Sequence, residues 1–180
     1  MRPRLEIETG GAKRKGSRTA LIRPEPGTRF HILLADDDPS VRESLAAVLS
    51  DDGYTVIPAK DGQEAVNLRA RARIDLVLLD LNMPGKSGWD AFERMTAENP
   101  LLPVVVITGK PNQLFTALGA GVGALLEKPV DIPMLLKTVK ALLAETPDTR
   151  LARMTGHATD FHYLPQGGRE FQIKDETQCG

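Results

Sequence analysis

The chain has 180 residues, of which 41% are hydrophobic and 26% charged, and its formal net charge is −1. This length fits one ordinary domain, and the composition excludes a globally disordered chain. A single cysteine excludes an intramolecular disulfide framework and a multi-cysteine metal site. No apolar run of about 18 residues predicts a membrane span, and the N-terminus lacks the apolar stretch of a secretory signal. We therefore expect a cytoplasmic protein.

The charges divide the chain into three segments. Residues 1–29 carry eight basic and three acidic side chains (net +5), residues 30–145 carry 11 and 16 (net −5), and residues 146–180 carry four and five (net −1). The first segment has few large apolar residues to offset its ordering entropy, which predicts a flexible basic arm. The last segment lacks hydrophobic periodicity, so we expect an irregular tail. The middle segment is the predicted folded domain.

Five short apolar runs in the middle segment predict β-strands. Runs that are apolar throughout are typical of strands buried on both faces of a parallel sheet. Pro58 lies within the second run and cannot donate a ladder hydrogen bond, which predicts that this strand lies at a sheet edge. The predicted strands are residues 31–35, 55–59, 75–79, 104–108 and 124–127.

Amphipathic stretches alternate with these runs and predict helices. Asp38 offers an N-cap acceptor and Pro39 suits the first helical position before a periodic stretch at 41–49. The last helix repeats this spacing at 135–143, and Pro147 is expected to end it. Three weaker helices are predicted at residues 64–71, 89–98 and 113–118. Five strands alternating with five helices indicate a doubly wound α/β domain with a parallel sheet.

Polar side chains follow four of the predicted strands at their carboxyl ends, where sites form in doubly wound sheets. The aspartates 36–38 follow the first strand, Asp80 the third, Thr108 ends the fourth, and Lys128 follows the fifth. Carboxylates at one sheet edge repel one another unless a hard cation is shared among them. Oxygen ligands without nearby His or Cys favour Mg²⁺ or Mn²⁺. A lysine and a hydroxyl beside them suit an incoming phosphoryl group, with the central carboxylate as the nucleophile.

Four segments of the middle domain resemble the receiver domain of bacterial two-component response regulators. They are ILLADDDPSVRESL, LVLLDLNMPGKSGW, VVVITG and LLEKPVD, in this order. Taken singly, each polar residue has a structural interpretation, and Asp38 is expected to be only a helix cap. The resemblance to the receiver domain is specific because all of these residues lie together at the ends of four predicted strands. The resemblance covers residues 30–145 and implies a flavodoxin-like sheet of five parallel strands in the order 2-1-3-4-5.

The resemblance also implies a role for each acidic residue. Asp80 corresponds to the phosphoacceptor, which would form an aspartyl phosphate. Asp37 corresponds to a direct metal ligand, and Asp36 assists through a metal-bound water. The backbone carbonyl of Asn82 would complete the protein's share of the metal shell.

Three further positions belong to the switch that the resemblance implies. Thr108 corresponds to the hydroxyl that follows the phosphoryl group, and Lys128 to the charge partner of Asp80, with a cis bond to Pro129. Leu125 stands where the family usually has an aromatic residue. A Tyr–Thr form of the switch is therefore not available, although a leucine can still change rotamer. The stretch between Thr108 and Lys128 is also short, which predicts a short or irregular fourth helix.

Together these features predict a stand-alone response regulator that accepts a phosphoryl group from a sensor histidine kinase or a histidine phosphotransfer protein. The 35 residues after the domain are too few for an effector, so we expect a downstream protein partner. The basic arm lacks aromatic residues and helical spacing, which argues against nucleic-acid binding. Self-catalysed phosphorylation and dephosphorylation would not make the protein an enzyme in the usual sense.

Two alternatives are compatible with the same residues. The first is a binding module that keeps the receiver fold but signals without phosphorylation, for which Leu125 and the short fourth helix are the argument. The second is a phosphohydrolase with an aspartate nucleophile. Such enzymes usually carry a second aspartate two residues after the nucleophile, where this chain has Asn82.

Overall fold

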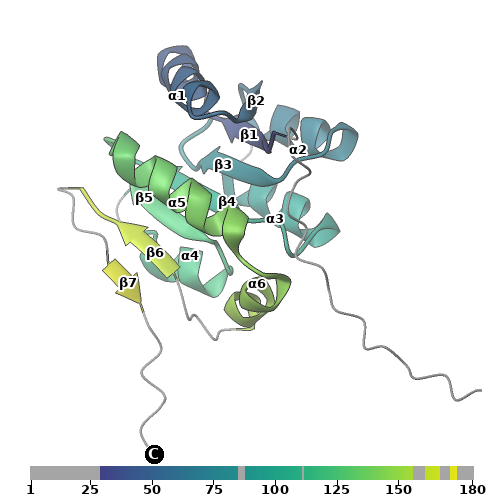
Figure 1. Cartoon of the computed structure of the whole chain (residues 1–180), viewed down its shortest axis with the longest axis vertical. Helices are drawn as coiled ribbons and strands as arrows, with labels where there is room; N and C mark the ends of the chain where they lie inside the picture. Colours follow the sequence, from purple (N-terminus) through teal and green to yellow (C-terminus); the bar gives the residue numbers. More distant parts are fainter. Residues whose placement is uncertain (1–28, 85–87, 111, 156–160, 167–170, 174–180) are drawn as a thin grey trace, which may run out of the picture.

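The centre of the fold is a sheet whose strands follow the order β2-β1-β3-β4-β5-β6-β7 (Figure 1). The computed structural model describes residues 29–84, 88–110, 112–155, 161–166 and 171–173. The predicted basic arm lies outside the described residues except for Arg29.

The first five strands are all parallel, in the predicted order 2-1-3-4-5, and their bounds agree with the sequence prediction except that β3 lies one residue later. Every residue of β3 and β4 is buried, which explains their unbroken apolar runs. β2 lies at the edge of the sheet with its Pro58 exposed, which confirms the edge prediction. The strands are β1 (His31–Ala35), β2 (Thr55–Ala59), β3 (Leu76–Asp80), β4 (Val104–Thr108) and β5 (Ala124–Glu127).

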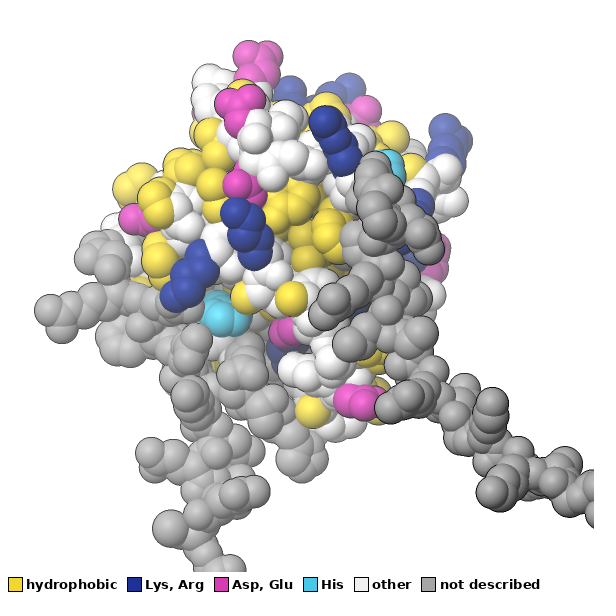
Figure 2. Space-filling view, in the orientation of Figure 1, with side chains coloured by type: hydrophobic (Ala, Val, Ile, Leu, Met, Phe, Trp, Pro, Cys, Tyr) yellow, Lys and Arg dark blue, Asp and Glu magenta, His cyan; other side chains and the backbone are white. Residues whose placement is uncertain are grey.

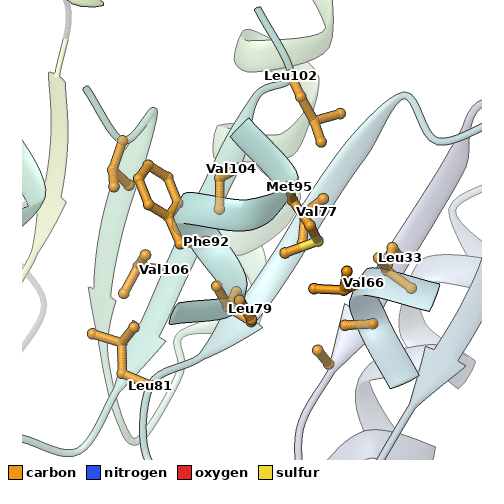
Figure 3. Close-up of a cluster of buried hydrophobic side chains, with 14 of the residues drawn as sticks. Leu33, Val66, Val77, Leu79, Leu81, Phe92, Met95, Leu102, Val104 and Val106 are labelled. Atoms are coloured by element: carbon orange, nitrogen blue, oxygen red, sulfur yellow. The ribbon is translucent and has the colours of Figure 1, made fainter. Parts of the chain in front are cut away.

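Helices cover both faces of this sheet. Side chains of α1 and α5 pack against one face, and side chains of α2, α3 and α4 pack against the other. Figure 3 shows part of the layer that α3 forms, where Phe92 and Met95 lie near three valines of the sheet, Val77 of β3 and Val104 and Val106 of β4. Asp38 caps α1 as predicted, and α4 is short, as predicted. The helices are α1 (Pro39–Asp51), α2 (Gly62–Arg71), α3 (Gly88–Glu98), α4 (Leu114–Gly119) and α5 (Ile132–Ala144).

The residues after α5 differ from the predicted irregular tail. They form α6 (Pro147–Met154), β6 (Phe161–Leu164) and β7 (Phe171–Ile173). β6 pairs in parallel with β5, and β7 pairs antiparallel with β6. The described residues therefore contain seven strands and six helices, where five of each were predicted.

Local chemistry explains this correction. The side chain of Thr146 accepts a hydrogen bond from the Thr149 backbone amide, and Pro147 occupies the first turn of α6. Pro147 is therefore the first residue of α6, and it also follows the end of α5. β6 is anchored by Phe161, which is 1% exposed, and by buried Leu164. These two side chains pack in the core clusters on opposite faces of the sheet.

The surface of the described part of the chain carries mixed charge. On the face seen in Figure 2, lysine, arginine and acidic side chains lie among hydrophobic ones over much of the molecule. No helix in the described ranges has both the length and the hydropathy that crossing a lipid bilayer requires.

Candidate functional site

The carboxyl ends of β1 and β3 bring three aspartates together. Asp36 and Asp37 follow β1 directly, and Asp80 is the last residue of β3, the neighbouring strand. One carboxylate oxygen from each of the three lies within 4.8 Å of the other two. Asp36 and Asp80 are only 1% and 2% exposed, whereas Asp37 is open to solvent. Three of the four aspartates predicted at the strand ends thus form one cluster, and the fourth, Asp38, caps α1.

Lys128 joins two of these carboxylates. Its Nζ atom lies 2.6 Å from Asp80 Oδ2 and 2.9 Å from Asp36 Oδ2. Burial lowers the pKa of Lys128, but the hydrogen bonds and charges of Asp80 and Asp36 together raise this pKa above its ordinary value. The ammonium group therefore stays charged at neutral pH. The sequence predicts the pairing of Lys128 with Asp80 but not its contact with Asp36.

Backbone amides orient the two buried carboxylates. The Asp38 amide donates a hydrogen bond of 2.9 Å to Asp36 Oδ1, and the Asn82 amide donates one of 2.8 Å to Asp80 Oδ1. The guanidinium of Arg42 donates to the backbone carbonyl of Asp36 over 2.6 Å. This contact of Arg42 was not predicted from the sequence. The only feature that could have indicated it is the position of Arg42 in the first turns of α1, close to Asp36. These contacts fix the chain on both sides of the acidic cluster.

The other two strand ends lie beside the cluster. Thr108 is fully buried at the end of β4, one residue beyond Ile107, the register partner of Asp80. Its hydroxyl oxygen accepts a hydrogen bond of 3.0 Å from the Lys110 amide. Leu125 is buried in β5, so the position expected to hold an aromatic ring is filled by a leucine. The bond between Lys128 and the following proline is cis, as the resemblance implies.

The cluster fits a hard divalent cation. Three carboxylates and one ammonium leave two negative charges, and bringing buried carboxylates together is costly without a compensating charge. All of the donors are oxygens, which are the ligands that Mg²⁺ and Mn²⁺ prefer. Asn82 Oδ1 is also buried beside this edge and has no hydrogen-bond partner among the described residues. The backbone carbonyl of Asn82 stays a predicted ligand.

Gly88, the first residue of α3, packs directly behind Asp80. A Cβ atom at this position would lie 2.6 Å from the Asp80 carbonyl oxygen and 2.6 Å from Leu81 Cα. Because backbone atoms cannot move aside cheaply, we expect Gly88→Ala to lower the free energy of unfolding by about 1–3 kcal/mol. Gly119→Ala, where a Cβ meets nothing within 4 Å, should cause no loss. Urea denaturation of both variants checks this, and equal stabilities would contradict it.

Several known proteins are similar to this chain over its folded domain. A family model described as the response regulator receiver domain matches residues 32–140, more than half of the chain. PilH of Pseudomonas aeruginosa is 38% identical over 117 residues, which are 63% of this chain and 97% of PilH. The response regulator MprA of Mycolicibacterium vanbaalenii is 40% identical over 120 residues, which are 65% of this chain. Those residues are 52% of MprA, so the match spans about half of that relative.

A solved structure gives the same result for the fold. The response regulator TrrA of Thermotoga maritima, crystallised in complex with Mg²⁺-BeF, has a TM-score of 0.59 and 27% identity. The similarity covers 63% of this chain and 98% of TrrA. The family match ends before α6, β6 and β7, which lie beyond residue 140. The matched residues include the ends of β1 and β3, whose aspartates form the acidic cluster, and Lys128 after β5. The chain therefore belongs to the response regulator receiver domain family of two-component systems.

Proposed function

We propose that this chain is a phosphoacceptor response regulator. Asp80 accepts a phosphoryl group from a sensor histidine kinase or a histidine phosphotransfer protein, and the signal passes on by contact with a downstream protein. One observation supports this proposal most strongly. The Lys128 ammonium contacts the buried carboxylates of Asp80 and Asp36, and the Asp37 carboxylate lies in the same cluster.

The residues of the acidic cluster would hold Mg²⁺ or Mn²⁺. Asp37 and Asp80 would be carboxylate ligands, the Asn82 carbonyl a third ligand, and Asp36 would act through a bound water. When bound, the cation supplies positive charge that offsets the charge of a phosphoryl group next to the carboxylates. The TrrA complex with Mg²⁺-BeF supports this assignment.

Phosphoryl transfer follows from the side chains at the strand ends. An Asp80 oxygen forms a bond to phosphorus while the donor's P–N bond breaks, and the bonding pair stays on the imidazole nitrogen. Among the described residues, each Asp80 oxygen accepts one hydrogen bond, which leaves a lone pair on each oxygen for ligation or for this step. The Lys128 ammonium then neutralises charge on the phosphoryl oxygens, and the Thr108 hydroxyl donates to one of them. Attack of water on phosphorus later restores the Asp80 carboxylate and releases phosphate.

Intact-protein mass spectrometry after incubation with Mg²⁺ and acetyl phosphate tests this proposal. We expect one added phosphoryl group per chain, which Asp80→Asn abolishes. Asp90→Asn, on the exposed surface of α3, is the matched control and should be labelled like the wild type. No added mass on the wild type, or equal mass on Asp80→Asn, would overturn the proposal.

The same proteins separate the two alternatives. A receiver-fold binding module would bind its partner equally well as wild type and as Asp80→Asn. A phosphohydrolase would release many equivalents of phosphate per chain from a phosphate ester. We expect phosphorylation to change partner binding, and no turnover of an ester beyond a single equivalent.

A further inference from the structure

β6 and the residues after it place polar groups next to the end of β5, which Lys128 directly follows. β6 lies beside β5, with β7 on its outer side (Figure 1). Tyr163 is the register partner of Leu125, and the last pair joins Leu126 to Leu164. The chain then runs on past the end of β5 as far as Gln166. Residues 161–166, which we call the clamp segment, lie outside the part of the chain matched to the receiver family.

The clamp segment holds both carboxylate oxygens of Glu127. The Tyr163 hydroxyl donates a hydrogen bond of 2.8 Å to Oε1, and the Gln166 backbone amide donates one of 3.0 Å to Oε2. Burial and the hydrogen bond to Glu127 raise the pKa of the Tyr163 hydroxyl. Glu127 immediately precedes Lys128, so its restraint fixes the chain next to the lysine.

The backbone of Lys128 itself is held from two sides. Its N–H donates to the carbonyl of Thr108 in β4 over 2.9 Å. Its carbonyl accepts a hydrogen bond from the side-chain amide of Gln166. Phe161 and Leu164 are buried on opposite faces of the sheet and hold the clamp segment in place. The Lys128 ammonium therefore extends toward the carboxylates of Asp80 and Asp36 from a backbone that the clamp segment restrains.

We propose that Tyr163 and Gln166 are positioning residues for phosphoryl transfer to Asp80, acting through Glu127 and the backbone of Lys128. This inference rests on the proposed function. The stabilisation that an ammonium gives to a developing charge depends on its distance from that charge, so a small displacement of Lys128 lowers the rate. The proposed metal ligands lie at the ends of β1 and β3, and the hydrogen bonds of the clamp segment do not reach them.

The double variant Tyr163→Phe/Gln166→Ala in the full chain tests the inference. It removes the hydrogen bond from the Tyr163 hydroxyl to Glu127 and the one from the Gln166 side chain to the Lys128 carbonyl. We therefore expect phosphorylation by acetyl phosphate at saturating Mg²⁺ to slow by about 3- to 10-fold. The apparent Mg²⁺ affinity, taken from the Mg²⁺ dependence of the rate, should stay that of the wild type. Tyr54→Phe removes the chain's other phenol, which immediately precedes β2, and is the matched control with an unchanged rate. Glu127→Gln should slow the reaction in the same direction, and it replaces the double variant if that protein does not fold.

A Lys128→Ala background shows whether the effect passes through the lysine. There the double substitution should change the residual rate no further, because the group that it positions is gone. An unchanged rate in the folded double variant would overturn the inference. So would a parallel loss of rate and Mg²⁺ affinity, or an equal loss of rate with and without Lys128. A wild type that takes up no phosphoryl group would instead overturn the proposed function.

Discussion

Lys128→Ala is expected to lower the free energy of unfolding by about 3 kcal/mol in metal-free buffer, because it leaves two buried carboxylates without the cation that joins them. The same change should slow phosphorylation by about 100-fold or more, since the ammonium no longer offsets charge on the phosphoryl group. Added Mg²⁺ should stabilise the variant more than the wild type, because Lys128 competes with a cation for Asp36 and Asp80. Urea denaturation with and without Mg²⁺ measures the stability effects.

The matched control for this prediction is Lys140→Ala. Lys140 also forms an ion pair, 3.0 Å from Asp52, but its side chain is 59% exposed. Exposed pairs contribute at most about 1 kcal/mol, so this variant should remain close to the wild type and show no special response to Mg²⁺. Equal losses of stability in the two lysine variants would contradict the description of the Lys128 contacts.

Phe161→Ala is expected to cost about 3–5 kcal/mol of unfolding free energy, the range for removing a buried phenylalanine ring. Phe161 is 1% exposed and belongs to the same core cluster as Phe92 and Leu125, so its loss leaves a cavity beside β5. Denaturant unfolding followed by circular dichroism measures this cost.

Phe115→Ala makes the same chemical change at a surface position. Its ring is 84% exposed on α4, and its removal should alter stability by no more than about 0.5 kcal/mol. If Phe161→Ala were as stable as Phe115→Ala, β6 would not be part of the folded domain and the clamp segment would have no anchor.

The parallel sheet could be predicted because its strands are buried on both faces and therefore appear as unbroken apolar runs. The predicted bounds of β1, β2, β4 and β5 agree with the structure. β3 is displaced by one residue and ends at Asp80, which pairs with Ile107 in the sheet. A polar residue that completes a ladder cannot be recognised from hydrophobicity alone.

The C-terminal strands could not be predicted in the same way. β6 has only four residues, one of them His162, and β5, its neighbour toward the centre of the sheet, is far away in sequence. A run this short shows no periodicity, and its burial depends on a neighbour that the local sequence does not identify. The start of α6 was readable, because Thr146 and Pro147 repeat the cap and first-turn proline of Asp38 and Pro39.

For the site, the sequence predicts which residues lie close together but not which hydrogen bonds and ion pairs they form. The carboxyl ends of parallel strands share one edge, so Asp36, Asp80 and Lys128 were expected together. The second contact of Lys128, with Asp36, depends on the reach of a flexible side chain. The hydrogen bonds from Tyr163 and Gln166 to Glu127 depend on β6, a strand that was not predicted.

We expect Asp80, assisted by Lys128 and Thr108, to accept a phosphoryl group at a Mg²⁺-binding acidic cluster. A crystal structure of the full chain with Mg²⁺ and beryllium fluoride, a mimic of the phosphoryl group, tests it most directly. We predict beryllium bonded to Asp80, the cation bound by Asp37 and Asp80, and fluorides contacting the Lys128 ammonium and the Thr108 hydroxyl. Beryllium fluoride bound at another residue, or a Lys128 ammonium that makes no contact with it, would contradict this expectation.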